Sequence, residues 1–326
     1  MPPSMATADK NEPDELFDVR NAYHVGNYQQ CITEANKVNP SSVELKVEKD
    51  VFMYRAYIAQ RKFAVVLGEI NLGSSPELLA VRRYAEYLSA NSEKKYVFFI
   101  TPRHTLGILS ISCSRRSIVE KLEQDVKKID ANSTYEVVLA ATIFTLEEMF
   151  EVALRLLHNA EALDRAMVMY ILLKMNRPDL ARKELKNMQD KDDDASLTQL
   201  AQGWLNLSSG GDKLQDAYYV FQEMADKYGS SPLLLNGQAC ALIGQGKFEE
   251  AESALQESLE KDPNNADTLV NMIVLSQSQG KAPEVANRYL NQLKDSHAEH
   301  PFVKAFGAKE SDFERVTKLY APSVVS

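Results

Sequence analysis

The chain has 326 residues, of which 44% are hydrophobic and 25% are charged, and its formal net charge is -9. Acidic and basic residues are mixed along the chain and form no basic stripe, which argues against nucleic acid as a ligand. The 3 cysteines are too few and too scattered for a disulfide framework or a zinc site. We therefore expect a globular protein of a reducing compartment.

Successive pairs of helices are predicted along most of the chain. Residues 1–13 lack the apolar core of a signal peptide and are expected to form a disordered N-terminal tail. Residues 14–299 carry apolar residues at helical spacing, interrupted by short turns. Residues 300–322 are predicted to form a C-terminal helix that caps the array, because a terminal repeat would otherwise expose apolar surface. Residues 323–326 form the remaining tail.

Residues 93–114 break the helical pattern. They are rich in β-branched and aromatic residues, contain Pro102 and Gly107, and show no helical period. They also fit a membrane span poorly, because Arg103 and His104 would lie near its middle, where charge is costly. The sequence therefore predicts a non-helical segment that interrupts the helical pattern.

The clearest internal repeat lies between Pro232 and Lys294. Its equivalent residues are 34 positions apart, namely Leu235 and Leu269, Gly246 and Gly280, Lys247 and Lys281, and Leu259 and Leu293. This is the tetratricopeptide period, and such a helix pair must stack on neighbours to bury its apolar face. The sequence therefore predicts an all-α fold, a right-handed α-solenoid of about eight tetratricopeptide-like helix pairs plus the C-terminal capping helix.

No motif of a known catalytic or cofactor site is found. The chain contains no phosphate-binding loop, dinucleotide fingerprint or nucleophile elbow. His297 and His300 have a spacing that could place a metal pair on one helical face, but no third ligand is evident and a proline follows. We expect no enzymatic activity, no cofactor, no metal and no small-molecule substrate.

Candidate partner-binding residues follow from the repeat. In tetratricopeptide arrays the first helix of each pair lines the concave face, so its residues that are not used in helix pairing are available to a ligand. Here these are Leu233, Asn236, Cys240, Ile243, Val270, Val274 and Gln277. They lack the cations with which such domains clamp a terminal carboxylate, and they suit a long-lived interface that buries a segment of a partner protein. For each of them the alternative is an ordinary place in the core.

Several strings outside the tetratricopeptide consensus carry a more specific resemblance. They are Asp14 to Val19, Tyr28 to Cys31, Tyr54 to Phe63, Leu180 to Lys186, Lys213 to Tyr219, Phe221 to Lys227, Asn287 to Leu290 and His300 to Phe302. Together they resemble the epsilon subunit family of coatomer, the COPI vesicle coat, over residues 14–92 and 115–322. In that family pattern the chain runs almost directly into the helix at Arg115, so residues 93–114 depart from it and are interpreted as a non-helical insertion that is extruded from the array.

The resemblance implies a non-enzymatic coat subunit. It would bind the C-terminal region of the alpha subunit within the heteroheptameric coat and support protein transport from Golgi to endoplasmic reticulum and within the Golgi. In the family the superhelix encircles a hairpin-like segment of that partner. The implied location is cytoplasmic and peripheral, on the cytosolic face of Golgi membranes and COPI-coated vesicles, with membrane contact only through the coat. The alternative is a chaperone-type tetratricopeptide adaptor that binds peptide segments reversibly.

Overall fold

The fold consists of two compact units. The structure is a computed structural model that describes residues 14–92, 98–100, 106–108, 115–126, 129, 133–158 and 162–320. Unit 1 comprises Met1–Tyr87 and Arg116–Glu161, and unit 2 comprises Leu88–Arg115 and Ala162–Ser326. The two predicted tails, residues 1–13 and 323–326, lie outside the described residues.

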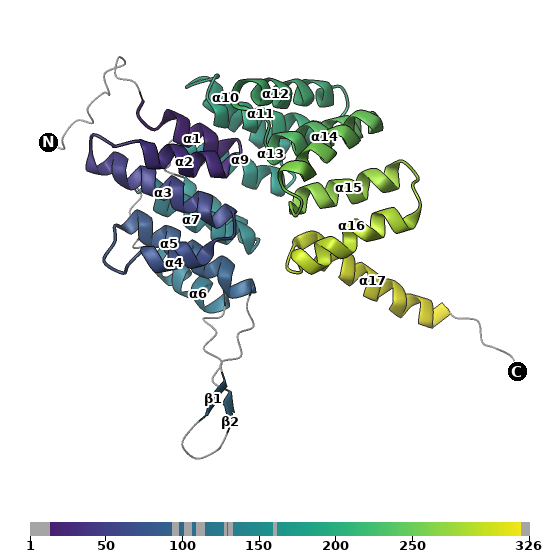
Figure 1. The fold of residues 1–326 in the computed structure, drawn as a ribbon, viewed down its shortest axis with the longest axis horizontal. Coiled ribbons are helices and arrows are strands. Elements are labelled where there is room, and N and C mark those ends of the chain that lie inside the picture. The colour runs from purple at the N-terminus through teal and green to yellow at the C-terminus, as the bar shows by residue number, and fades with distance from the viewer. Residues whose placement is uncertain are drawn as a thin grey trace, which may run out of the picture. The chain divides into compact units, whose positions relative to one another are not determined.

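The first eight helices lie mainly in unit 1 (Figure 1). They are α1 (Phe17–His24), α2 (Tyr28–Lys37), α3 (Val43–Ala59), α4 (Phe63–Glu69), α5 (Pro76–Ser92), α6 (Arg115–Asp125), α7 (Thr134–Leu146) and α8 (Phe150–Leu157). Consecutive helices pack on one another, α1 on α2, α2 on α3, α3 on α4 and α7 on α8. The core of the first pair includes Leu16, at the N-cap of α1, Val19 of α1, and Cys31 and Ala35 of α2, all fully buried. Cys31 and Ala35 are four residues apart and so lie on one face of α2.

Unit 2 continues the same pattern. Its helices are α9 (Ala162–Lys174), α10 (Pro178–Gln189), α11 (Ser196–Ser209), α12 (Lys213–Tyr228), α13 (Pro232–Gly244), α14 (Phe248–Lys261), α15 (Ala266–Ser278), α16 (Pro283–Ser296) and α17 (Pro301–Tyr320). Small Ala251, fully buried, lets α14 approach α13 closely, as its place in the repeat predicts. Among the described residues the helices form eight successive pairs followed by α17, so the predicted all-α array is confirmed.

Two short strands are the exception to the helical fold. Strands β1 (Phe98–Ile100) and β2 (Leu106–Ile108) pair antiparallel, with Phe98 opposite Ile108. They lie within residues 93–114, where β-branched and aromatic residues favour extended structure over helix. The other residues from 93 to 114 lie outside the described part of the chain, so their interpretation as an extruded insertion stays a prediction.

One turn geometry joins the two helices of most pairs. A residue with positive φ follows the first helix. The backbone N–H of the residue after it donates to the carbonyl of the residue five positions earlier in the chain, as the N–H of Lys247 does to the carbonyl of Leu242 over 2.9 Å. These turn residues are Gly26, Arg61, Glu148, Asn176, Gly246 and Gly280, with φ between 56° and 83°. Three of them are not glycine, so in those pairs the turn carries backbone strain.

Replacing Glu148 by glycine is expected to raise the free energy of unfolding of unit 1 by about 0.5–1 kcal/mol, because glycine adopts the left-handed conformation without a Cβ clash. The side chain of Glu148 is exposed, so few contacts are lost. The matched control is Glu151→Gly in the first turn of α8, where glycine should lower stability by about 1 kcal/mol. Urea unfolding followed by circular dichroism measures both variants. Equal losses of stability in the two would show that the Glu148 turn is not strained.

Helix α17 covers the end of the array with its first turns only. Phe302, Val303 and Phe306 pack on the cluster formed by α15 and α16, which includes Leu269 and Leu290. From Ala308 onward every described side chain of α17 is exposed, and no residue of the helix is fully buried. The exposed apolar residues of this second half are Phe313, Val316, Leu319 and Tyr320. The cap interpretation therefore rests on the first half of the helix.

Candidate partner-binding faces

The first helices of the pairs in unit 2 pack against one another as well as against their own partners. Helix α9 contacts α11, α11 contacts α13, and α13 contacts α15. We call the first-helix positions of unit 2 that the sequence predicts to meet a partner the unit 2 face. Its predicted members are Leu233, Asn236, Cys240, Ile243, Val270, Val274 and Gln277.

Six of these seven residues keep accessible surface. Val274 and Gln277 are exposed, and the side chain of Val274 is 38% accessible. Leu233, Cys240, Ile243 and Val270 are half-buried. None of the seven carries a charge. Burial raises the pKa of the Cys240 thiol to about 11, so the thiol is neutral as well. The unit 2 face therefore offers apolar and neutral polar surface to a ligand.

Asn236 differs from the others because it is only 7% accessible. Its amide nitrogen donates to the Pro232 carbonyl over 2.7 Å and to the Thr268 hydroxyl over 2.8 Å, and its oxygen accepts from the Asn271 amide over 2.8 Å. The side chain therefore joins α13 to α15 through a buried polar network. The sequence places Asn236 on the surface of the groove, whereas the structure uses it in the packing between repeats.

Sequence reasoning missed a second face, on the first helices of unit 1. Cys240 lies six residues before the positive-φ residue Gly246, and Val274 lies six residues before Gly280. The same count back from Gly26 and Arg61 reaches Arg20 and Arg55, so this position is cationic in α1 and α3, whereas the count back from Glu148 reaches the uncharged Thr142 in α7. Counting from the turns could have found both arginines. We call the surface around Arg20 and Arg55 the unit 1 face.

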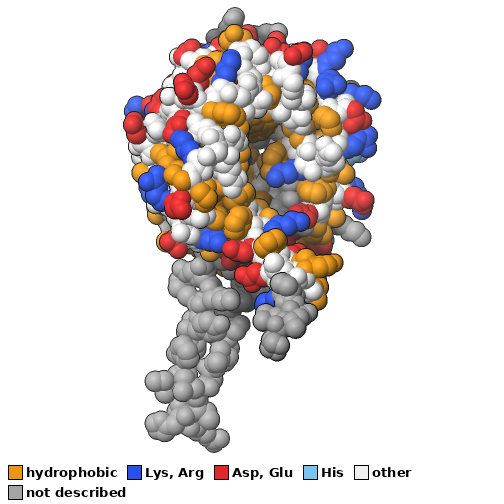
Figure 2. Space-filling model, turned by 90° about the vertical axis from the view of Figure 1, so that its right-hand side faces the viewer, with side chains coloured by type: hydrophobic (Ala, Val, Ile, Leu, Met, Phe, Trp, Pro, Cys, Tyr) orange, Lys and Arg blue, Asp and Glu red, His pale blue; other side chains and the backbone are white. Residues whose placement is uncertain are grey.

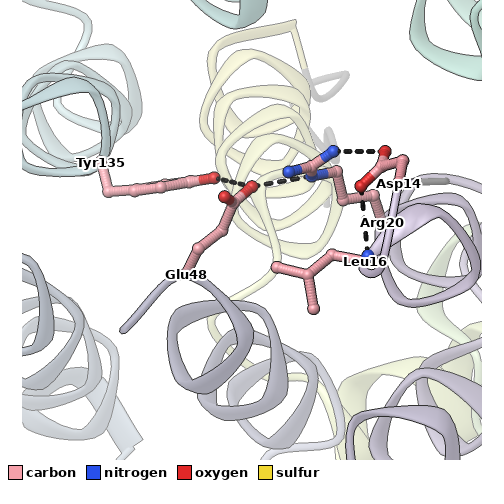
Figure 3. Close-up of polar contacts among 5 residues, drawn as sticks. All are labelled: Asp14, Leu16, Arg20, Glu48 and Tyr135. Carbon is pink, nitrogen blue, oxygen red and sulfur yellow. Dashed lines mark hydrogen bonds and ion pairs between the residues drawn. The ribbon is translucent and has the colours of Figure 1, made fainter. Parts of the chain in front are cut away.

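Arg20 is held by carboxylates from two segments (Figure 3). Its guanidinium bonds to Asp14 over 2.6 Å and to Glu48 of α3 over 2.7 Å. Glu48 also accepts the hydroxyl of Tyr135, from α7, over 2.7 Å, and Asp14 accepts the N–H of Leu16 at the start of α1. Burial, reinforced by the Glu48 carboxylate, raises the pKa of the Tyr135 hydroxyl, which therefore stays protonated. The network ties together α1, α3 and α7, which are distant in sequence.

Arg55 lies on an aromatic platform. Its guanidinium carbon is 4.6 Å from the ring centre of Tyr23 and 5.7 Å from that of Phe52. His24 packs edge-on against both of these rings. Burial lowers the pKa of His24 to about 3, with further lowering by the charges of Arg55 and Arg20. The imidazole is therefore neutral at physiological pH, and the charge of this surface comes from the arginines.

Charged and hydrophobic side chains are mixed on the surface of the described residues. Figure 2 shows lysine, arginine, aspartate and glutamate side chains interspersed with hydrophobic ones over the face that it draws. Within the described ranges, no group of three or more potential metal ligands comes together. No helix of the described chain has the length and hydropathy needed to cross a bilayer.

Comparison with known proteins places the chain in a family. A sequence model described as "Coatomer epsilon subunit" matches residues 12–100 and 104–321. The chain is similar to coatomer subunit epsilon-1 of Arabidopsis thaliana, with 38% identity over 95% of this chain and 98% of the relative. It is also similar to coatomer subunit epsilon of Caenorhabditis elegans, with 37% identity over 93% of this chain and 97% of the relative.

Solved structures support the repeat fold. A tetratricopeptide repeat protein from Parabacteroides merdae aligns with a TM-score of 0.54 at 10% identity, covering 85% of this chain and 96% of that protein. A Rap protein complexed with competence and sporulation factor aligns with a TM-score of 0.52 at 10% identity, covering 94% of this chain and 92% of that protein. These likenesses concern the fold alone. The family match and the identity over nearly the full length show that this chain belongs to the coatomer epsilon subunit family.

Proposed function

We propose that this chain is a non-enzymatic subunit of the COPI vesicle coat that binds the C-terminal region of the coatomer alpha subunit. In this role it supports Golgi-to-endoplasmic-reticulum and intra-Golgi protein transport. The observation that carries the proposal is the similarity to coatomer epsilon subunits over 95% of the chain. The protein would be cytoplasmic and would reach Golgi membranes and COPI-coated vesicles through the rest of the coat.

The chemistry of the unit 2 face supports a stable protein partner. Leu233, Ile243, Val270 and Val274 present apolar surface that is at least partly accessible, and no charged side chain is among the predicted contacts. Burying such a surface against a partner is favourable by about 25 cal/mol per Å² of apolar area, and it does not weaken with salt as an ionic contact does. A subunit of a permanent assembly needs this kind of contact.

Recovery of the full chain from cells, with an affinity tag and mass identification of the bound proteins, tests the proposal. The coat subunits, including the alpha subunit, are expected to co-purify and to remain bound as salt is raised from about 0.15 M to about 1 M. Recovery as a free monomer would contradict a coat subunit. Recovery with short peptide tails that salt removes would favour the chaperone-type adaptor instead.

A variant pair tests the unit 2 face itself. Val274→Asp places a carboxylate in the proposed interface and is expected to reduce binding of the alpha-subunit region by at least about tenfold, because the buried charge would have no partner. Tyr219→Asp, on the second helix α12 where the side chain is 60% accessible, is the control and should bind as the wild type does. Calorimetric titration measures both. Equal binding by the two variants would exclude Val274 from the interface.

A further inference from the structure

We propose that Arg55 is a recognition site for a carboxylate group on a protein segment that binds along the unit 1 face. The identity of the partner rests on the proposed function, whereas the binding site itself is inferred from the structure. Arg55 occupies on α3 the place that Cys240 occupies on α13, six residues before the turn. It therefore holds a first-helix position at which a tetratricopeptide array meets its ligands.

The rings of Tyr23 and Phe52 support the guanidinium of Arg55. The rings of Tyr23 and Phe52 lie edge to face, with centres 5.4 Å apart, and the guanidinium sits over both. A guanidinium is flat and carries its N–H groups in its own plane. The rings therefore cover one side of the guanidinium, while none of its N–H groups is used in a hydrogen bond within the described residues.

Arg55 has no carboxylate of its own. Within the part of the chain that the structure describes, its guanidinium makes ring contacts but no ion pair or hydrogen bond. Arg20, at the equivalent position on α1, is by contrast paired with two carboxylates, those of Asp14 and Glu48. The side chain of Arg55 is half-buried, and a guanidinium in that setting has lost part of its hydration without gaining an anion. An incoming carboxylate would supply the missing partner.

The local charges favour a monoanion. The carboxylates of Asp14 and Glu48 both bind Arg20 and neither binds Arg55, although the formal charges of these four groups sum to zero. His24 contributes none, because burial and the two arginines keep it neutral. A carboxylate matches one guanidinium in charge and in its two-pronged geometry. Because the four groups are neutral together, a phosphate dianion would bring twice the excess negative charge that a carboxylate brings beside Glu48, so a glutamate, an aspartate or a terminal carboxylate of the partner is the favoured ligand.

The site can be tested on the full chain without any partner. The Nε–Hε resonance of Arg55 is identified by its loss in Arg55→Gln and is then followed during titration with acetate, with sodium chloride at equal ionic strength as the control. We expect a saturable shift with acetate that chloride does not reproduce, and a smaller response of Arg20, whose guanidinium is already paired. An equal response to acetate and chloride, or a response to inorganic phosphate alone, would overturn the carboxylate assignment.

A second measurement uses the C-terminal region of the alpha subunit as the probe. Arg55→Gln is expected to weaken the binding of this region by at least about tenfold. Arg55→Lys keeps the positive charge but loses the two-pronged N–H geometry of the guanidinium, so its affinity should lie between those of the wild type and Arg55→Gln. The matched control is Lys46→Gln, which removes an exposed cation from the same helix and should change the affinity less than about twofold. Equal affinities of Arg55→Gln and Lys46→Gln would overturn the role of Arg55. Failure of the wild type to bind would instead contradict the proposed function, and the acetate titration would still decide the site.

Discussion

Replacing Phe221 with alanine is expected to lower the free energy of unfolding of unit 2 by about 3–5 kcal/mol, the range for deleting a fully buried phenyl ring. Phe221 of α12 has no accessible surface and lies between α11 and α13. The backbones of these helices hold the ring closely, and the alanine variant would leave a cavity that they cannot fill. Urea unfolding followed by the fluorescence of Trp204, the single tryptophan and a residue of α11, measures the change.

Two glycines make room for the Phe221 ring. A Cβ at Gly203 or at Gly237 would approach ring atoms of Phe221 to 2.8 Å, closer than van der Waals contact allows. The backbones at the two glycines therefore confine the ring on two sides. Gly237→Ala should therefore destabilise unit 2 as well. Combined with Phe221→Leu it should cost less than the sum of the two single changes.

The matched control for Phe221 is Phe313→Ala in α17, the same chemical change at a side chain that is 70% accessible. Its effect should stay within about 0.5 kcal/mol, as for most surface substitutions. Similar losses in Phe221→Ala and Phe313→Ala would contradict the tight packing described for α11, α12 and α13. Additive effects of Gly237→Ala and Phe221→Leu would show that the ring and the glycine do not compete for space.

The fold was predictable where local chemistry repeats. Gly246 and Gly280, 34 residues apart, mark equivalent turns, and the small residue five positions after Gly246, Ala251, marks the close contact between helices. Such features depend on backbone sterics within one helix pair, so a single sequence reveals them. Glu148 shows where this fails, because it takes the same left-handed conformation without being glycine.

The candidate faces were less predictable because they depend on contacts between repeats. From its position in the repeat, Asn236 was predicted to lie on the groove surface. In the structure it is buried between α13 and α15, where it forms hydrogen bonds with Thr268 and Asn271. In the same way, the sequence does not distinguish Arg20 from Arg55. The difference between a paired and an unpaired guanidinium arises from Asp14 and Glu48, which reach Arg20 only in the folded chain.

Acid is expected to destabilise unit 1 through His24. In the folded chain burial, followed by the charges of Arg55 and Arg20, lowers the pKa of this side chain from 6.5 to about 3. In the unfolded chain it titrates near its ordinary value, so between these two pKa values the unfolded state binds the extra proton. Stability due to neutral His24 is therefore complete above pH 6.5 and is lost as pH falls towards 3. The loss is about 2 kcal/mol at pH 5.

Urea unfolding at pH 7 and pH 5, followed by circular dichroism, measures this effect when the wild type is compared with His24→Phe. Phenylalanine keeps an aromatic ring against Tyr23 and Phe52 but has no proton to bind, so the loss of stability between the two pH values should shrink by about 2 kcal/mol. His158→Phe changes an exposed histidine at the end of α8 and should leave the pH dependence as in the wild type. An unchanged pH dependence in His24→Phe would mean that the carboxylates of unit 1, rather than His24, govern its acid sensitivity. Because Arg55 contributes to the low pKa of His24, Arg55→Gln should raise the pH at which the acid loss levels off, while the onset of the loss near pH 6.5 stays unchanged.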